Sequence, residues 1–179
     1  MLYPSIRDNI SPNAVVAVLG KPETIIAFSE YLLFFDMSKL QPDIKEETYQ
    51  KAISKIKNLK DKLTLDLICN TLYDMFENWN FCGFYILNDN ELEISFYKSE
   101  KIPCSPINMD GVCGQSLNSR KIIIVPNVSK FHGHIECDPN SKSEITIPFL
   151  NYVLDIDSKE LDDFDEIDKK YLKEIIEMI

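Results

Sequence analysis

The chain has 179 residues, of which 45% are apolar and 11% aromatic, and its formal net charge is −10 at pH 7. This is the composition of an ordinary globular protein that can bury its own core, and not that of an intrinsically disordered chain. The negative charge argues against nucleic acids and anionic membrane surfaces as partners, because clustered Lys and Arg bind both.

Two further features bear on where the protein works. No apolar run approaches the roughly 20 residues that span a bilayer, and the N-terminus lacks the pattern of a secretory signal. We therefore expect a cytoplasmic protein. Its five cysteines are then expected to be free, catalytic or metal-bound rather than paired in structural disulfides.

Residues 1–40 form a distinct N-terminal segment that is punctuated by Pro4, Pro12 and Pro22. We expect an extension that packs on the rest of the chain or forms a contact in a homodimer. The remaining residues, 41–179, have the length of a single domain.

Three amphipathic helices are predicted from apolar residues at three- and four-residue steps, over 42–59, 61–77 and 165–178. Asp61 is the expected N-cap of the second helix. Cys69 lies inside that helix and is expected to be a small buried apolar residue.

Strands are predicted where the apolar period changes to two, over 81–87, 91–97, 121–125, 144–149 and 152–157. The residues between them, 98–120 and 126–143, are expected to be irregular, and the second stretch is a long polar loop with both histidines. This order predicts an α+β fold with helices packed on one face of an antiparallel sheet. The long loops, with a ligand cavity beneath them, would lie on the other face.

The last two predicted strands allow a check by residue counting. If residues 150–151 form the turn, Glu144 lies opposite Asp157 and Thr146 lies opposite Asp155, so the three carboxylates share one face of the sheet. Their mutual repulsion should raise the pKa of at least one of them. Pro148 in the same hairpin indicates an edge position or a bulge.

Four short motifs carry two cysteines and the three carboxylates. They read Gly-Val-Cys-Gly at 111–114, Gly-His-Ile-Glu-Cys-Asp at 133–138, Ser-Glu-Ile at 143–145 and Val-Leu-Asp-Ile-Asp-Ser at 153–158. Together they resemble the signature of the GAF-domain reductases of free methionine-(R)-sulfoxide, and the similarity covers about residues 45–179. The resemblance implies a GAF-like domain with this oxidoreductase activity.

The resemblance also implies roles for individual residues. Cys137 would be the thiolate that attacks the sulfoxide sulfur, Cys104 its main resolving partner and Cys113 an additional one. Glu144, Asp155 and Asp157 match the substrate-binding carboxylates of the family.

An aromatic motif of the family, Asn-Trp-x-Gly-Phe-Tyr, aligns with residues 80–85 and adds two substrate-binding residues. Phe81 stands where the family has Trp, and Tyr85 closes the motif. A second alignment, with Trp79 in the role of that Trp, requires a two-residue insertion.

The chemistry needs these residue types. A thiolate attacks sulfur, and the product is methionine and a cysteine sulfenic acid, which condenses with a second thiol. An external dithiol, for which thioredoxin is expected, must then reduce the disulfide, and no bound cofactor is needed. The departing oxygen needs a proton from a carboxylic acid of raised pKa, and Glu144 is the first candidate.

Two other functions remain open at this point. The domain could be a non-catalytic GAF-type ligand or redox sensor. It could also be a zinc-binding module, since Cys113, His132, His134 and Cys137 are zinc-type ligands, although their spacing is not that of a strong zinc motif.

Overall fold

The structure is a computed structural model that describes residues 40–59, 63–133 and 137–179, with only the backbone of residues 40–43. The expected N-terminal extension lies almost wholly outside these residues, so its packing or dimer role stays a prediction. His134 also lies outside them. None of the helices in the described part of the chain has the length and apolar content needed to cross a membrane.

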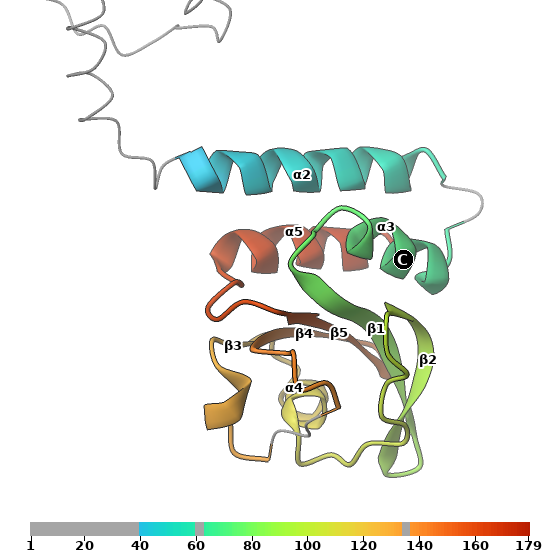
Figure 1. The fold of residues 1–179 in the computed structure, drawn as a ribbon. Coiled ribbons are helices and arrows are strands. Elements are labelled where there is room, and N and C mark those ends of the chain that lie inside the picture. The colour runs from blue at the N-terminus through green and yellow to red at the C-terminus, as the bar shows by residue number, and fades with distance from the viewer. Residues whose placement is uncertain (1–39, 60–62, 134–136) are drawn as a thin grey trace, which may run out of the picture. The chain divides into compact units, whose positions relative to one another are not determined.

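Three helices lie on one face of the sheet (Figure 1): α2 (Leu40–Lys57), α3 (Leu65–Tyr73) and α5 (Glu166–Ile176). They confirm the three predicted amphipathic helices. The boundaries of α3 differ from the prediction, because its N-cap is Thr64, whose side chain accepts a hydrogen bond from the Leu67 N–H. Asp61, the expected cap, lies outside the described residues, and the cap of α3 is Thr64 instead.

The sheet has five antiparallel strands in the order β2-β1-β5-β4-β3. They are β1 (Trp79–Asn88), β2 (Glu91–Ser99), β3 (Ile123–Val125), β4 (Ser143–Phe149) and β5 (Tyr152–Ser158). All five predicted strands are present, and β3 is shorter than predicted. The α+β class is thereby confirmed, with helices on one face of the sheet.

The β4–β5 hairpin has the register that residue counting predicted. Its turn is Leu150-Asn151, and Leu150 adopts a positive φ of 52°. Glu144 pairs with Asp157 and Thr146 pairs with Asp155. Because β3 pairs with β4 only as far as Thr146, the later residue Pro148 occupies an edge position, as its missing N–H requires.

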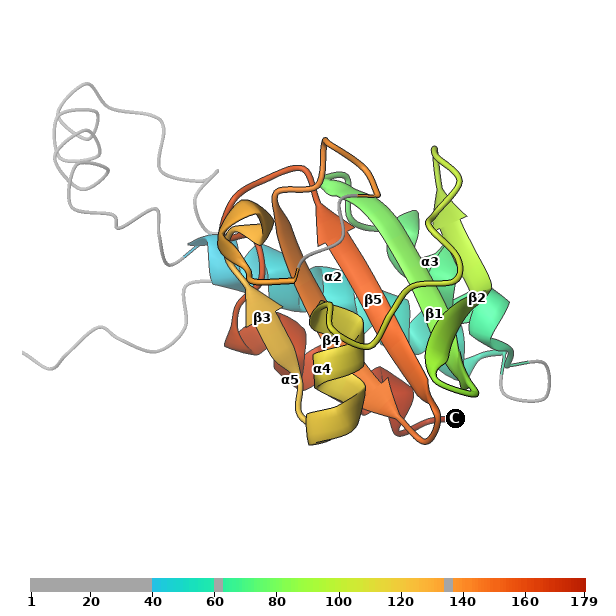
Figure 2. The ribbon, with the colours of Figure 1, turned by 90° about the horizontal axis from the view of Figure 1, so that it is seen from below.

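A fourth helix, α4 (Val112–Ser119), packs against β4 and β5 on the face opposite the other three helices (Figures 1 and 2). The prediction that residues 98–120 are wholly irregular was wrong here, because a glycine, two serines and an asparagine in eight residues make a weak helical signal. A Cβ on Gly114 would lie 2.3 Å from the Met109 carbonyl oxygen. Glycine therefore lets α4 lie against the preceding loop.

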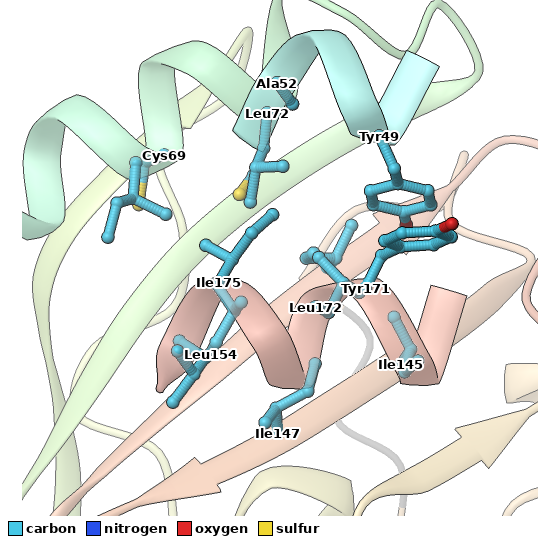
Figure 3. Packing of buried hydrophobic residues seen from close by; sticks show 14 of the residues in the cluster. Tyr49, Ala52, Cys69, Leu72, Ile145, Ile147, Leu154, Tyr171, Leu172 and Ile175 are labelled. Carbon is cyan, nitrogen blue, oxygen red and sulfur yellow. The ribbon is translucent and has the colours of Figure 1, made fainter. Parts of the chain in front are cut away.

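The main core lies between the sheet and the three helices on its first face (Figure 3). Cys69 is fully buried in it, as expected. Each buried Leu or Ile side chain contributes about 1.5–3 kcal/mol to folding. Here they come from both layers: Leu72, Ile145, Ile147, Leu154, Leu172 and Ile175. This core fixes β4 and β5, which present their other side chains to the loop face.

Candidate active site

A pocket lies on the loop face of the sheet, bounded by β1, β4, β5, the start of α4 and the loops around them. All the residues predicted for the site except Cys104 line it, namely Phe81, Tyr85, Cys113, Cys137, Glu144, Asp155 and Asp157. The structure thus brings together residues that are as far as 76 positions apart in sequence, from 81 to 157. Their chemical roles stay predictions.

Two sulfurs meet at the edge of this pocket. Cys104 and Cys137 form a disulfide, with their Cα atoms 5.6 Å apart. The Tyr85 hydroxyl donates a 3.0 Å hydrogen bond to the Cys104 carbonyl oxygen, which ties the Cys104 loop to β1. Burial raises the pKa of Tyr85, so its hydroxyl keeps the proton that it donates.

Cys113 lies in the first turn of α4 and is free and buried. Its thiol is hydrogen-bonded to the Asp155 side chain. Burial raises the pKa of this thiol well above its usual value, and the charges of Asp155 and Glu144 raise it further. Cys113 is therefore a neutral hydrogen-bond donor to Asp155 here, whereas a nucleophilic cysteine must be a thiolate. An additional resolving role for it stays a prediction.

Glu144 and Asp155 form a buried acidic pair, with exposed fractions of only 4% and 8%. Burial raises the pKa of Glu144, and the charge of Asp157 adds to the effect. Burial also raises the pKa of Asp155, where the charge of Glu144 adds to it. Because the two side chains are hydrogen-bonded to each other, we infer that the pair retains a proton near neutrality. This agrees with the raised pKa expected from the sequence.

Asp157 is held by a chain of hydrogen bonds that the sequence did not reveal. The Ser141 hydroxyl donates to Asp157 Oδ2 over 2.8 Å. Asn80 Nδ2 donates to the Ser141 hydroxyl over 2.9 Å and to Asp138 Oδ2 over 3.1 Å. One buried amide on β1 thus positions both Asp157 and the segment that begins at Cys137.

Lys101 completes this network from the loop after β2, with Nζ 2.5 Å from Asp138 Oδ1. Burial acts to raise the pKa of Asp138, but the hydrogen bond from Lys101 and further donors hold it below its usual value. In the sequence, only its position at the start of the aromatic motif at residues 80–85 could have identified Asn80 as a site residue. No sequence feature identified Ser141 or Lys101.

The aromatic wall of the pocket is Phe81, and Trp79 takes no part in it. β1 has an irregularity between these residues, because Trp79 pairs with Ser158 while Phe81 pairs with Asp157. Trp79 belongs to the main core, where its ring stacks on Phe76 at 4.1 Å between centroids. A Cβ on Gly83 would lie 2.5 Å from Phe81 Cζ, so glycine there leaves space for the ring.

The pocket also has features that suit an anion and a metal ion. Gly111, Val112 and Cys113 line it, and the N-terminus of α4 has no side-chain cap, so its N–H groups can receive a carboxylate. Cys113, Glu144 and Asp155 each offer one ligand atom within 4.8 Å of the others. The Cys and His set considered from the sequence is not assembled among the described residues, because His132 lines a different hollow.

Comparisons with known proteins bear on the family and the fold of this chain. No protein-family model matches the sequence. The chain is 38% identical over 146 residues to GAF domain-containing protein A of Dictyostelium discoideum, covering 75% of this chain and 92% of that protein. It is 30% identical over 155 residues to free methionine-R-sulfoxide reductase of Saccharomyces cerevisiae, covering 75% of this chain and 85% of the relative.

A solved structure agrees with these sequence relatives. Free methionine-R-sulfoxide reductase from Neisseria meningitidis, in complex with its substrate, superposes with a TM-score of 0.70 at 29% identity. The match covers 75% of this chain and 87% of that one. With the relatives above, it confirms the GAF fold that the sequence motifs predicted.

Proposed function

This chain belongs to the free methionine-R-sulfoxide reductase family of GAF domains, and from that premise we propose that it reduces free L-methionine-(R)-sulfoxide with its own thiols. One observation carries the proposal: Cys137 lines a pocket with three carboxylates and is disulfide-bonded to Cys104. A nucleophilic sulfur, a second sulfur within bonding distance and a source of protons are what sulfoxide reduction requires.

The proposed cycle begins with the Cys137 thiolate. It attacks the sulfoxide sulfur, the sulfoxide oxygen takes up one proton, and the S–O bond breaks. The oxygen passes to the Cys137 sulfur, so that the substrate leaves as methionine and Cys137 becomes a sulfenic acid. The Cys104 thiol then attacks the sulfenic sulfur, which releases water and forms the Cys104–Cys137 disulfide. Thioredoxin, oxidised to its own disulfide, returns both cysteines to thiols. This recycling suits the reducing cytoplasm expected from the sequence.

The Glu144–Asp155 pair supplies the proton for the departing oxygen. A carboxylic acid can act as a general acid near neutrality only if its pKa is raised, and burial raises the pKa of both members of the pair. Glu144 is the proposed donor to the substrate, and Asp155, hydrogen-bonded to it, shares the proton. Cys113 donates to Asp155 and so keeps that side chain in place.

A free amino acid carries two charges, and the pocket offers a partner for each. Asp157 and the acidic pair can hold the substrate ammonium. The uncapped N-terminus of α4 can hold the carboxylate of the substrate, while the Phe81 ring covers the substrate's side chain. A methionine sulfoxide inside a polypeptide has neither charge, so it would leave buried carboxylates unpaired, and this favours the free amino acid.

The proposal is tested by an assay coupled to thioredoxin, thioredoxin reductase and NADPH, with the free R and S sulfoxides compared. We expect turnover of the R epimer and none by Cys137→Ser. Cys69→Ala is the matched control, because Cys69 is a buried thiol in the main core, away from the pocket. Absence of R-epimer turnover with both thioredoxin and dithiothreitol would refute the proposed function, and binding of the sulfoxide without turnover would indicate a sensor instead.

A further inference from the structure

We propose that Cys113, Glu144 and Asp155 form a binding site for a divalent cation of borderline softness, such as Zn²⁺ or Cd²⁺, and that this cation competes with the substrate. Binding of the cation is independent of the proposed function. The competition rests on that function, because it requires the same carboxylates to hold the substrate ammonium.

The geometry of the three ligand atoms suits such an ion. One atom from each side chain lies within 4.8 Å of the other two, and tetrahedral Zn²⁺ places its ligands about 3.5 Å apart. Small rotations of the three side chains would bring the ligand atoms to this separation. The ligands come from α4, β4 and β5, which are packed on one another, so the site is built on rigid elements.

A second observation also points to a cation. Asp155 is only 8% exposed. Its Oδ1 atom is buried and has no hydrogen-bond partner in the part of the chain that the structure describes. A buried acceptor without a partner costs about 1–3 kcal/mol. Lys101 is the only basic side chain among the described residues lining the pocket, and Asp138 already binds it.

The ligand types define the class of metal. One thiolate and two carboxylates suit Zn²⁺ and Cd²⁺, whereas Mg²⁺ and Ca²⁺ prefer oxygen ligands alone. Binding needs no oxidation or reduction. The cation displaces the proton of the Cys113 thiol and the proton shared by the acidic pair, and these protons pass to solvent.

The site can be tested in the disulfide form of the protein. With Cys104 and Cys137 paired, the remaining thiols are Cys69, Cys82 and Cys113, and only Cys113 lines the pocket. Titration with Cd²⁺ should therefore produce the ultraviolet charge-transfer band of a single cadmium–thiolate bond. Cys113→Ala should lose the band, and Cys69→Ala should keep it. Asp155→Asn should weaken binding by at least about tenfold.

Competition is measured in the same titration. Free methionine-(R)-sulfoxide should raise the apparent Kd for Cd²⁺, while free alanine at the same concentration should raise it less. The disulfide form does not reduce this substrate because Cys137 is already paired with Cys104. An unchanged band in Cys113→Ala, or no band in the native protein, would overturn the metal site. A Kd that does not respond to the sulfoxide would overturn the competition. Neither readout depends on turnover, so failure of the proposed function is detected separately.

Discussion

Trp79 and Phe81 are two residues apart on β1, yet their rings lie on opposite faces of the sheet. Side chains two apart on a regular strand share a face, and the irregular pairing of β1 with β5 between these residues removes that relation. Trp79 is packed in the main core and Phe81 lines the pocket. This placement favours the alignment of the family's tryptophan with Phe81 rather than with Trp79.

The two rings should therefore respond differently to substitution. Phe81→Leu is expected to raise KM for the free sulfoxide about tenfold with a small change in stability, because it removes the aromatic cover of the pocket. Trp79→Ala should lower the free energy of unfolding by about 3–5 kcal/mol. Steady-state kinetics and urea denaturation separate these effects. A larger KM effect at Trp79 in protein that remains folded would contradict the assignment.

Glu144→Gln is expected to lower kcat by about 100-fold or more, because an amide cannot supply the proton for the departing oxygen. KM should change less, since the side chain keeps its size and its hydrogen-bonding capacity. Native kcat should fall as the pH rises through the raised pKa of the acidic pair, and the variant should lose this dependence. Near-normal kcat in Glu144→Gln would remove this residue from proton transfer.

The same pair should make stability depend on pH. Burial raises the pKa of both carboxyls in the folded protein, so the folded state holds more protons than the unfolded state above about pH 4. The free energy of unfolding is therefore expected to fall as the pH rises from about 4 through the folded-state pKa, by about 1 kcal/mol or more. Urea denaturation at several pH values measures this. Glu144→Gln should flatten the curve and be relatively more stable at high pH.

Cys104→Ser tests the second sulfur. One equivalent of methionine per protein should form at close to the native rate, because Cys137 is intact. Thioredoxin-supported turnover should fall by about tenfold or more, because the sulfenic acid on Cys137 has lost the thiol with which it condenses. Single-turnover quantitation of methionine and dimedone trapping of the sulfenic acid follow the two steps. Full multiple turnover in this variant would assign resolution to Cys113 instead.

Asn80 is a positioning residue, and its removal should act on the substrate site without touching the chemistry. Asn80→Ala breaks the hydrogen bonds to Ser141 and Asp138 and should raise KM about tenfold with a smaller effect on kcat. Hydrogen exchange should increase in residues 137–142. Asn70→Ala is the comparison variant, since this amide on α3 lies outside the pocket lining and donates only to Asp66. A fall in kcat alone would argue against positioning.

Much of the fold could be predicted because the signals are local. The apolar periods predicted the three helices of the first face and all five strands, and the length of the turn at Leu150 determined that Glu144 faces Asp157. The α4 helix escaped prediction because its residues have low helical propensity and its close approach to Met109 is a tertiary contact. Thr64 replaced Asp61 as a cap because several polar residues precede α3, and local pattern alone does not choose among them.

The sequence by itself determined which chemical groups this protein has and on which face of the β4–β5 hairpin its carboxylates lie, because side-chain alternation along a strand follows from backbone geometry. The family resemblance already implied that Cys137 pairs with Cys104, as it does in the structure. Only the tertiary structure decided that Cys113 is hydrogen-bonded to Asp155 and that Asn80 holds Asp157 through Ser141. These contacts join segments distant in the chain, and they depend on how loops and helices pack on the sheet rather than on any local period.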